Sequence, residues 1–181
     1  ITLIVVAPFS SLAAKRDKQR STITYSAPEK LKGLNDEMFG CKILSHKYDK
    51  DSGISTITFK GKLTTIGARA FHHSDISAIE LPKSVTTIGE EAFAGCINLQ
   101  SITLHEGITT ISRKAFDGCV GITTVSLPSS VTTLDKEAFR GCNIKTVAIG
   151  KVFNTIPILY EVFPNVTTLN LQPGIKEIKS N

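Results

Sequence analysis

The sequence predicts a repeat solenoid, in which short β-strands stack into a ladder on one face and turns and short helices line the other face. Two series of apolar residues predict it. Four phenylalanines lie 22, 23 and 23 residues apart, at Phe71, Phe93, Phe116 and Phe139. Six pairs of apolar residues, each pair separated by one residue, recur every 22 or 23 residues over the same stretch. Each period is therefore expected to form one turn of a coil.

The apolar pairs are predicted to form the strands of the ladder. Alternate side chains of a strand point to opposite faces, so Ile102 and Leu104 face inward while Ser101 and Thr103 face outward. The six pairs are Ile57 with Phe59, Ile79 with Leu81, Ile102 with Leu104, Val125 with Leu127, Val147 with Ile149, and Leu169 with Leu171.

The rest of each period predicts a second corner and a turn. A Thr-Thr-Ile segment is rich in β-branched residues, which favour extended backbone. The segment that begins with Glu90 and Glu91 and ends at Phe93 predicts a helical or 3₁₀ turn, with both glutamates solvated and the phenylalanine pointing inward. Gly95 then lets the chain leave that turn. One turn of the coil cannot bury its own apolar face, so neighbouring turns must stack about 4.7 to 4.9 Å apart.

Three regions are expected along the 181 residues. Residues 1–14 are apolar and then small, with Ser11, Ala13 and Ala14 near a cleavage point, which indicates the remnant of a secretory signal peptide. The alternative is a buried strand at the end of the solenoid. Residues 15–51 are interpreted as a linker and a degenerate N-terminal capping repeat, and residues 52–181 as the solenoid. The solenoid is expected to be truncated, because residues 175–178 match only the opening of another repeat.

The repeat carries a family resemblance. The pattern L-P-x-S-V-T-T-I-G-x-x-A-F-x-G-C-x-x-L-x-x-I-x-L, nearly complete from Leu81 to Leu104, resembles the BspA-like leucine-rich repeat family. The resemblance covers about residues 52 to 178 and is specific at Leu127, Pro128, Ser130, Val131, Ala138, Phe139, Gly141 and Cys142. It implies a right-handed leucine-rich repeat solenoid, export to the cell surface, and adhesion or recognition by binding another protein or a glycan. It implies no particular ligand.

Three cysteines, Cys96, Cys119 and Cys142, occupy equivalent repeat positions, and Ser74 takes that place one repeat earlier. Stacked thiols raise the possibility of disulfides or a metal site. Parallel side chains one strand spacing apart do not converge as a disulfide requires, and three thiols in line make a poor tetrahedral zinc site. We therefore expect small, buried apolar residues beside the phenylalanines.

No other group predicts catalysis, a metal or a cofactor. His72, His73 and Asp75 are close in sequence, but neighbouring residues on a turn diverge, so an exposed loop variant is expected. Glu90 and Glu91 lie on one turn and do not face each other across a cleft as a glycosidase requires. No nucleophile recurs with a histidine and a carboxylate, so the chain is not expected to be an enzyme.

The net charge of +5 is mild, and part of it lies in Lys15, Arg16, Lys18 and Arg20. Basic residues do not alternate with aromatic residues along one face, so no nucleic-acid partner is expected. The apolar run at the N-terminus is too short, and too interrupted by Pro8, to span a bilayer. We expect no membrane insertion of the mature chain. An uncapped C-terminal end predicts a possible contact with a second copy.

The outward side of the strand ladder is the candidate ligand-binding surface. It is broad and rich in hydroxyl groups, and the residues proposed to bind there are Glu80, Ser101, Thr103, Thr124 and Ser126. The expected partner is an extracellular protein or glycan. The face has no aromatic anchor, and the chain has no tryptophan, although binding hot spots favour Trp, Tyr and Arg. The alternative is a structural stalk or spacer that displays another domain and has no ligand of its own.

Overall fold

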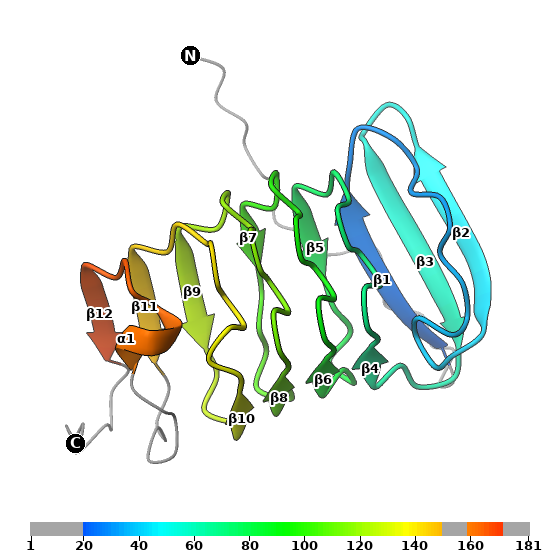
Figure 1. The fold of residues 1–181 in the computed structure, drawn as a ribbon. Helices are drawn as coiled ribbons and strands as arrows, with labels where there is room; N and C mark the ends of the chain where they lie inside the picture. The colour runs from blue at the N-terminus through cyan, green and yellow to red at the C-terminus, as the bar shows by residue number, and fades with distance from the viewer. Residues whose placement is uncertain (1–19, 150–158, 172–181) are drawn as a thin grey trace.

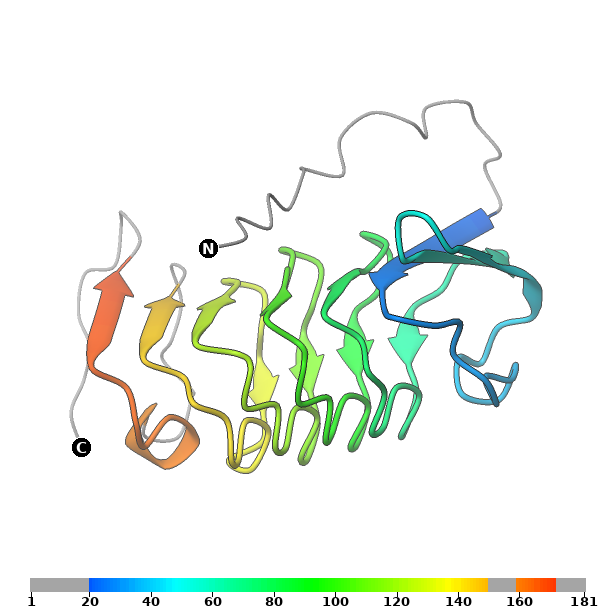
Figure 2. The same cartoon turned by 90° about the horizontal axis from the view of Figure 1, so that it is seen from above.

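The computed structural model of the protein describes residues 20–149 and 159–171, and it has a β-solenoid fold (Figure 1). The predicted signal remnant at residues 1–14 and the partial repeat at residues 175–178 lie outside the described residues. The chain winds through successive turns, each of which we call a rung. Short strands from successive rungs form two rows on opposite sides of the coil (Figure 2).

The first row corresponds to the predicted ladder, but it consists of two sheets, because β7 and β9 are not paired with each other. Strand β7 pairs in parallel with β5, and β11 pairs in parallel with both β9 and β12. Equivalent residues of successive repeats lie opposite each other. For example, Val147 of β11 lies opposite Val125 of β9. These strands are β5 (Ala78–Glu80), β7 (Ser101–Ile102), β9 (Thr124–Leu127), β11 (Thr146–Ile149) and β12 (Thr168–Leu171).

The second row consists of two-residue strands from the Thr-Thr-Ile segments. They form a parallel sheet in the order β10-β8-β6-β4, again with equivalent residues opposite each other. The isoleucine or leucine of each strand is buried, which closes this side of the core. The strands are β4 (Thr65–Ile66), β6 (Thr87–Ile88), β8 (Thr110–Ile111) and β10 (Thr133–Leu134).

The phenylalanines form one continuous column through the core. The rings of Phe71 and Phe93 are stacked with centroids 5.2 Å apart, and the Phe93 and Phe116 rings repeat the same spacing. Phe116 and Phe139 follow at 4.9 Å. Phe163 extends the column, 5.2 Å from Phe139, although in the sequence an insertion around Pro157 displaces it from the repeat spacing. The predicted inward position of the phenylalanines is confirmed.

The N-terminal end differs from a simple rung. Strands β1 (Arg20–Ser26), β2 (Ile43–Asp49) and β3 (Ile54–Lys60) join the first row in the order β2-β3-β1-β5-β7. Strand β1 runs antiparallel to both β3 and β5. The pair Ile57 and Phe59 on β3 is therefore not adjacent to the pair on β5, as an unbroken ladder would require. Residues Ile23 and Tyr25 of β1 are fully buried and separate the two.

The predicted short helices are absent from the turns that carry Phe71, Phe93 and Phe116, where the structure has turns instead. A left-handed residue interrupts each of them: Arg69, Glu91 and Lys114 have φ angles of 58°, 53° and 54°. A right-handed helix cannot pass through such a residue. The only α-helix in the described part of the chain is α1 (Leu159–Val162).

Hydrogen bonds between rungs replace the bonds that a helix would make. The N–H of Phe71 donates to the carbonyl of Ala92 at 2.7 Å, and Phe93 donates to Ala115 at 2.8 Å. Phe116 donates to Ala138 in the same way, also at 2.8 Å. The turn backbone therefore forms a third column of bonds along the solenoid, in addition to the two rows of strands.

Candidate ligand-binding face

All five residues proposed to bind a ligand lie on the outward side of the first row and are exposed. Strand β5 carries Glu80 and β7 carries Ser101, while Thr103 follows directly after β7. Strand β9 carries Thr124 and Ser126, which alternate with the buried Val125 and Leu127. We call this surface, defined by Glu80, Ser101, Thr103, Thr124 and Ser126, the ladder face. The outward orientation predicted from alternation is confirmed for these residues.

The ladder face offers unpaired polar groups. Within residues 20–149 and 159–171, the side chains of its five residues make no hydrogen bond or ion pair to another protein group. Each hydroxyl group has one donor and two acceptor positions, and the carboxylate of Glu80 accepts only. Within each of the two sheets, parallel pairing makes these groups recur at the strand spacing. The face can therefore form several hydrogen bonds with an extended polar ligand.

A second set of threonines is equally regular but is used internally. Thr86 Oγ1 donates to the carbonyl of Thr64 at 3.3 Å, Thr109 to Thr86 at 3.2 Å, and Thr132 to Thr109 at 3.3 Å. Each bond joins one rung to the preceding rung. These hydroxyls stabilise the coil, whereas those of the ladder face remain available.

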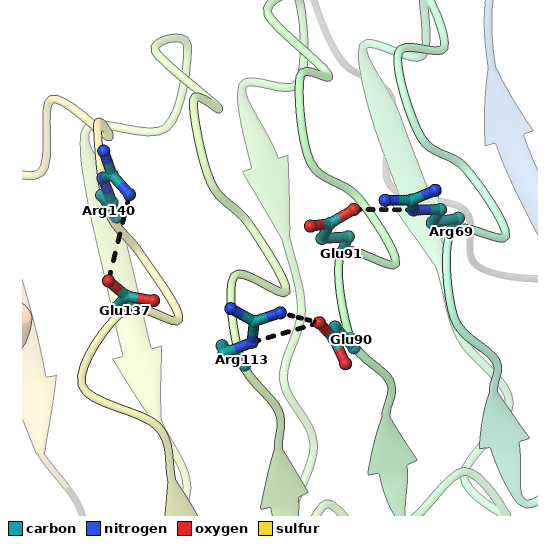
Figure 3. Close-up of polar contacts among 6 residues, drawn as sticks. All are labelled: Arg69, Glu90, Glu91, Arg113, Glu137 and Arg140. Atoms are coloured by element: carbon teal, nitrogen blue, oxygen red, sulfur yellow. Dashed lines mark hydrogen bonds and ion pairs between the residues drawn. The ribbon is translucent and has the colours of Figure 1, made fainter.

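The turns carry ion pairs between rungs, shown in Figure 3. Arg69 Nε contacts Glu91 Oε2 at 2.7 Å, and Arg113 pairs with Glu90 one rung further along. The hydrogen bond from Arg69 lowers the pKa of Glu91 below its usual value. The predicted solvated helical turn is thus corrected: both glutamates pair with arginines, and no helix is present. The Arg113–Glu90 pair, in which the side chains are 53% and 48% exposed, contributes little to stability because water screens it.

The sequence profile of the BspA type Leucine rich repeat region matches residues 41–170, in six copies. This chain belongs to the BspA-type leucine-rich repeat family. Among solved structures, it is similar to a leucine rich cell surface protein from Faecalibacterium prausnitzii A2-165, with 27% identity and a TM-score of 0.54. That match covers 60% of this chain and 30% of the other.

The pneumococcal vaccine antigen PcpA shares the fold, with 23% identity and a TM-score of 0.53, over 66% of this chain and 31% of PcpA. The matched region spans about a third of the length of the Faecalibacterium protein and about a third of the length of PcpA. No match was found among curated protein sequences. In the described part of the chain, no helix has the length and apolar character needed to cross a membrane.

The cysteines of the BspA-type repeats form a buried column of free thiols. Cys96 Sγ donates to the carbonyl of Phe71 at 2.9 Å, and Cys119 and Cys142 donate to Phe93 and Phe116 at 3.0 Å each. Hydrogen bonds with the neighbouring thiols, together with burial, raise the pKa of Cys119. Each cysteine therefore joins two rungs through the phenylalanine backbone.

The histidine pair lies on an exposed turn, where we expected it. The rings of His72 and His73 are 4.2 Å apart and nearly perpendicular. His73 has a φ of 53° and occupies the position of Gly95 and Gly118, so it adopts a backbone conformation that favours glycine. In residues 20–149 and 159–171, no three His, Cys, Asp or Glu side chains are arranged to hold a metal ion.

The N-terminal cap, formed by β1, β2 and β3, contains a polar contact that the sequence alone does not predict. Tyr25 Oη lies 2.6 Å from His46 Nε2 and accepts the N–H of Leu31 at 3.2 Å. Burial raises the pKa of Tyr25 and lowers the pKa of His46. No repeat pattern marks these residues because the cap occurs once, so only their placement by β1 and β2 brings them together.

Proposed function

We propose that this chain is the recognition section of a secreted or cell-surface protein, and that its ladder face binds an extracellular protein or glycan. The coil is expected to have the right-handed sense typical of leucine-rich repeats. The observation that carries the proposal is the exposure of five polar side chains on adjacent rungs, none of which has a partner within the described residues. Membership of a family that includes a bacterial cell-surface protein supports it further.

The rigidity of the ladder favours binding. Parallel pairing fixes the backbone of β5 against β7 and that of β9 against β11. Short side chains such as Ser and Thr lose little rotamer entropy when they bind. A ligand that also carries hydroxyl, amide or carboxyl groups at regular spacing gains several hydrogen bonds without rearrangement of the protein. An extended polypeptide or an oligosaccharide meets this requirement.

An array of glycans and extracellular matrix proteins tests the proposal directly. The wild-type chain should give a saturable signal, and the double variant Thr103→Arg/Ser126→Arg should weaken it at least about tenfold, because two long charged side chains would cover the face. The matched control is Ala68→Arg/Asn143→Arg, which adds the same charge at exposed positions outside the strand rows. Equal loss in both double variants would contradict a site on the ladder face.

A second function, a structural stalk or spacer, is favoured by a different observation. The ladder face has no aromatic residue among its five members, although aromatic side chains dominate binding hot spots. The stalk hypothesis predicts that no member of the array gives a saturable signal with this chain. It also predicts that lengthening the solenoid by one repeat leaves binding by the remainder of the protein unchanged.

A further inference from the structure

Four exposed lysines gather where the N-terminal cap meets the first rung. We call this surface the basic corner, and define it by Lys42, Lys60, Lys62 and Lys83. The N–H of Lys60 donates to the carbonyl of Lys42 at 2.8 Å, so the backbones of these two lysines are adjacent. Lys62 follows Lys60 after one residue, at the end of β3.

A buried serine attaches the other segments of the corner to β1. Ser21 Oγ donates to the carbonyl of Gly61 at 3.0 Å and accepts the N–H of Leu63 at 2.8 Å, so it holds both neighbours of Lys62. Ser84 Oγ, next to Lys83, donates to the carbonyl of Leu63 at 2.6 Å. The lysine backbones are therefore fixed relative to one another, while their side chains extend into solvent.

The positive charge of the corner is not neutralised within the protein. Among the described residues, none of the four lysines takes part in an ion pair. Two carboxyl groups belong to segments next to the corner. Asp36 accepts the N–H of Ile43 at 2.7 Å and Glu106 accepts from Ser129 Oγ at 2.7 Å, but among the described residues neither forms an ion pair with a lysine of the corner.

We propose that the basic corner binds an acidic polysaccharide, through ion pairs between its lysines and sulfate or carboxylate groups. Lysine ammonium groups act as mobile point charges with three donors each, which suits the dispersed acidic groups of a polysaccharide. Four like charges that the fold brings to one corner also attract a polyanion from a distance. The one aromatic residue next in sequence to these lysines, Phe59 before Lys60, is fully buried and cannot stack on a nucleotide base, which disfavours a nucleic acid. This surface is separate from the five residues of the ladder face.

Binding of the full chain to heparin, as a sulfated probe, tests the proposal by titration. Unsulfated dextran is the neutral probe and duplex DNA is the alternative polyanion. Heparin should bind at about 50 mM salt and weaken at least tenfold by about 200 mM, because its counterions are released on binding. Lys60→Glu/Lys62→Glu should weaken heparin binding at least about tenfold at the lower salt concentration. Dextran should not bind.

The control Lys136→Glu/Lys145→Glu makes the same change in net charge at exposed positions four rungs into the solenoid, and it should bind heparin within about twofold of wild type. Equal losses in the two double variants, absence of heparin binding at low salt, or tighter binding of DNA than of heparin would each overturn the proposal. Thr103→Arg/Ser126→Arg should keep heparin binding, so failure of the ladder face and failure of the basic corner are distinguishable.

Discussion

Phe116 shows most clearly what a single residue contributes to this fold. Its ring is fully buried between the stacked rings of Phe93 and Phe139, at centroid distances of 5.2 and 4.9 Å. The neighbouring rungs cannot close the gap that its removal would leave, because hydrogen bonds at both rows of strands and at the turns fix the rung spacing. The column therefore makes each phenylalanine a large contributor to stability.

Phe116→Ala is expected to lower the free energy of unfolding by about 3 to 5 kcal/mol, since it removes a large buried side chain and leaves a cavity. The exposed Thr103→Ser is the control and should change it by less than about 0.5 kcal/mol. Urea unfolding followed by circular dichroism measures both. Equal effects from the two variants would contradict the inward and outward assignments.

His73 offers a prediction of opposite sign. It has a φ of 53° at a position where the next two rungs have glycine. His73→Gly should raise the free energy of unfolding by up to about 1 kcal/mol, because the left-handed conformation disfavours a side chain. Gly95→Ala should lower it, because its φ is 73° and a Cβ there would lie 2.3 Å from His73 Nδ1. Thermal unfolding in which both changes had the same sign would refute this explanation.

The thiols predict a clear order of chemical reactivity. The raised pKa of Cys119 keeps its sulfur protonated at pH 8, and only the thiolate reacts with an alkylating agent. Cys41 is only partly buried, so iodoacetamide should modify it first, at least about tenfold faster than Cys119. Peptide mass spectrometry identifies the modified residues. Rapid labelling of Cys119 in the folded protein would show that the column is not closed.

At the scale of the element, the strands could be predicted and the turns could not. Alternation and period place the strands β5, β7, β9, β11 and β12, because a buried strand face has a direct signature in sequence. Arg69, Glu91 and Lys114 are good helix formers, and nothing local marks them as left-handed. Bonds to the next rung, such as Arg69 N–H to Glu90 O at 3.0 Å, impose that conformation.

The cap is the other element that the period could not reveal. Strand β1 has the alternation of a strand, with Ile23 and Tyr25 buried, but its antiparallel place between β3 and β5 depends on contacts far apart in sequence. The sequence predicts a linker and a degenerate capping repeat over residues 15–51, and the position of β1 between β3 and β5 is not contained in that prediction. The polar contact of Tyr25 with His46 holds the loop after β1 through Leu31.

This contact makes the stability of the cap depend on pH. Burial lowers the pKa of His46 in the folded protein, so its contribution is present above the unfolded value of about 6.5 and is lost as the pH falls through the folded value. Unfolding measured from pH 7.5 down to pH 5 should show this decline. His46→Gln should reduce the dependence, and an unchanged profile would exclude His46 as its source.

At the scale of the whole molecule, the sequence predicts the coil and the orientation of the ladder face. All five proposed residues are exposed, as expected from their alternation with the buried pairs. The sequence does not show which hydroxyls are free and which, like those of Thr86, Thr109 and Thr132, bond to a neighbouring rung, because both sets recur with the repeat. Only the hydrogen bonds between rungs identify the second set as structural. The basic corner was also missed, because its lysines come from the cap and the first rung, not from one repeat position.

The central claim is that each repeat forms one turn of the solenoid, so that equivalent residues of successive repeats lie next to each other along its axis. Dipolar electron paramagnetic resonance measures it directly, from continuous-wave line broadening for the nearer label pairs and from double electron–electron resonance for the farthest. The variant has its native cysteines replaced and carries spin labels at Glu80→Cys and at one ladder position further along. With the second label at Thr103, Ser126, Ala148 or Asn170, the mean distance should increase by about 4.7 to 4.9 Å per rung. Distances that do not increase in step with rung number would contradict the stacked solenoid and the binding face built on it.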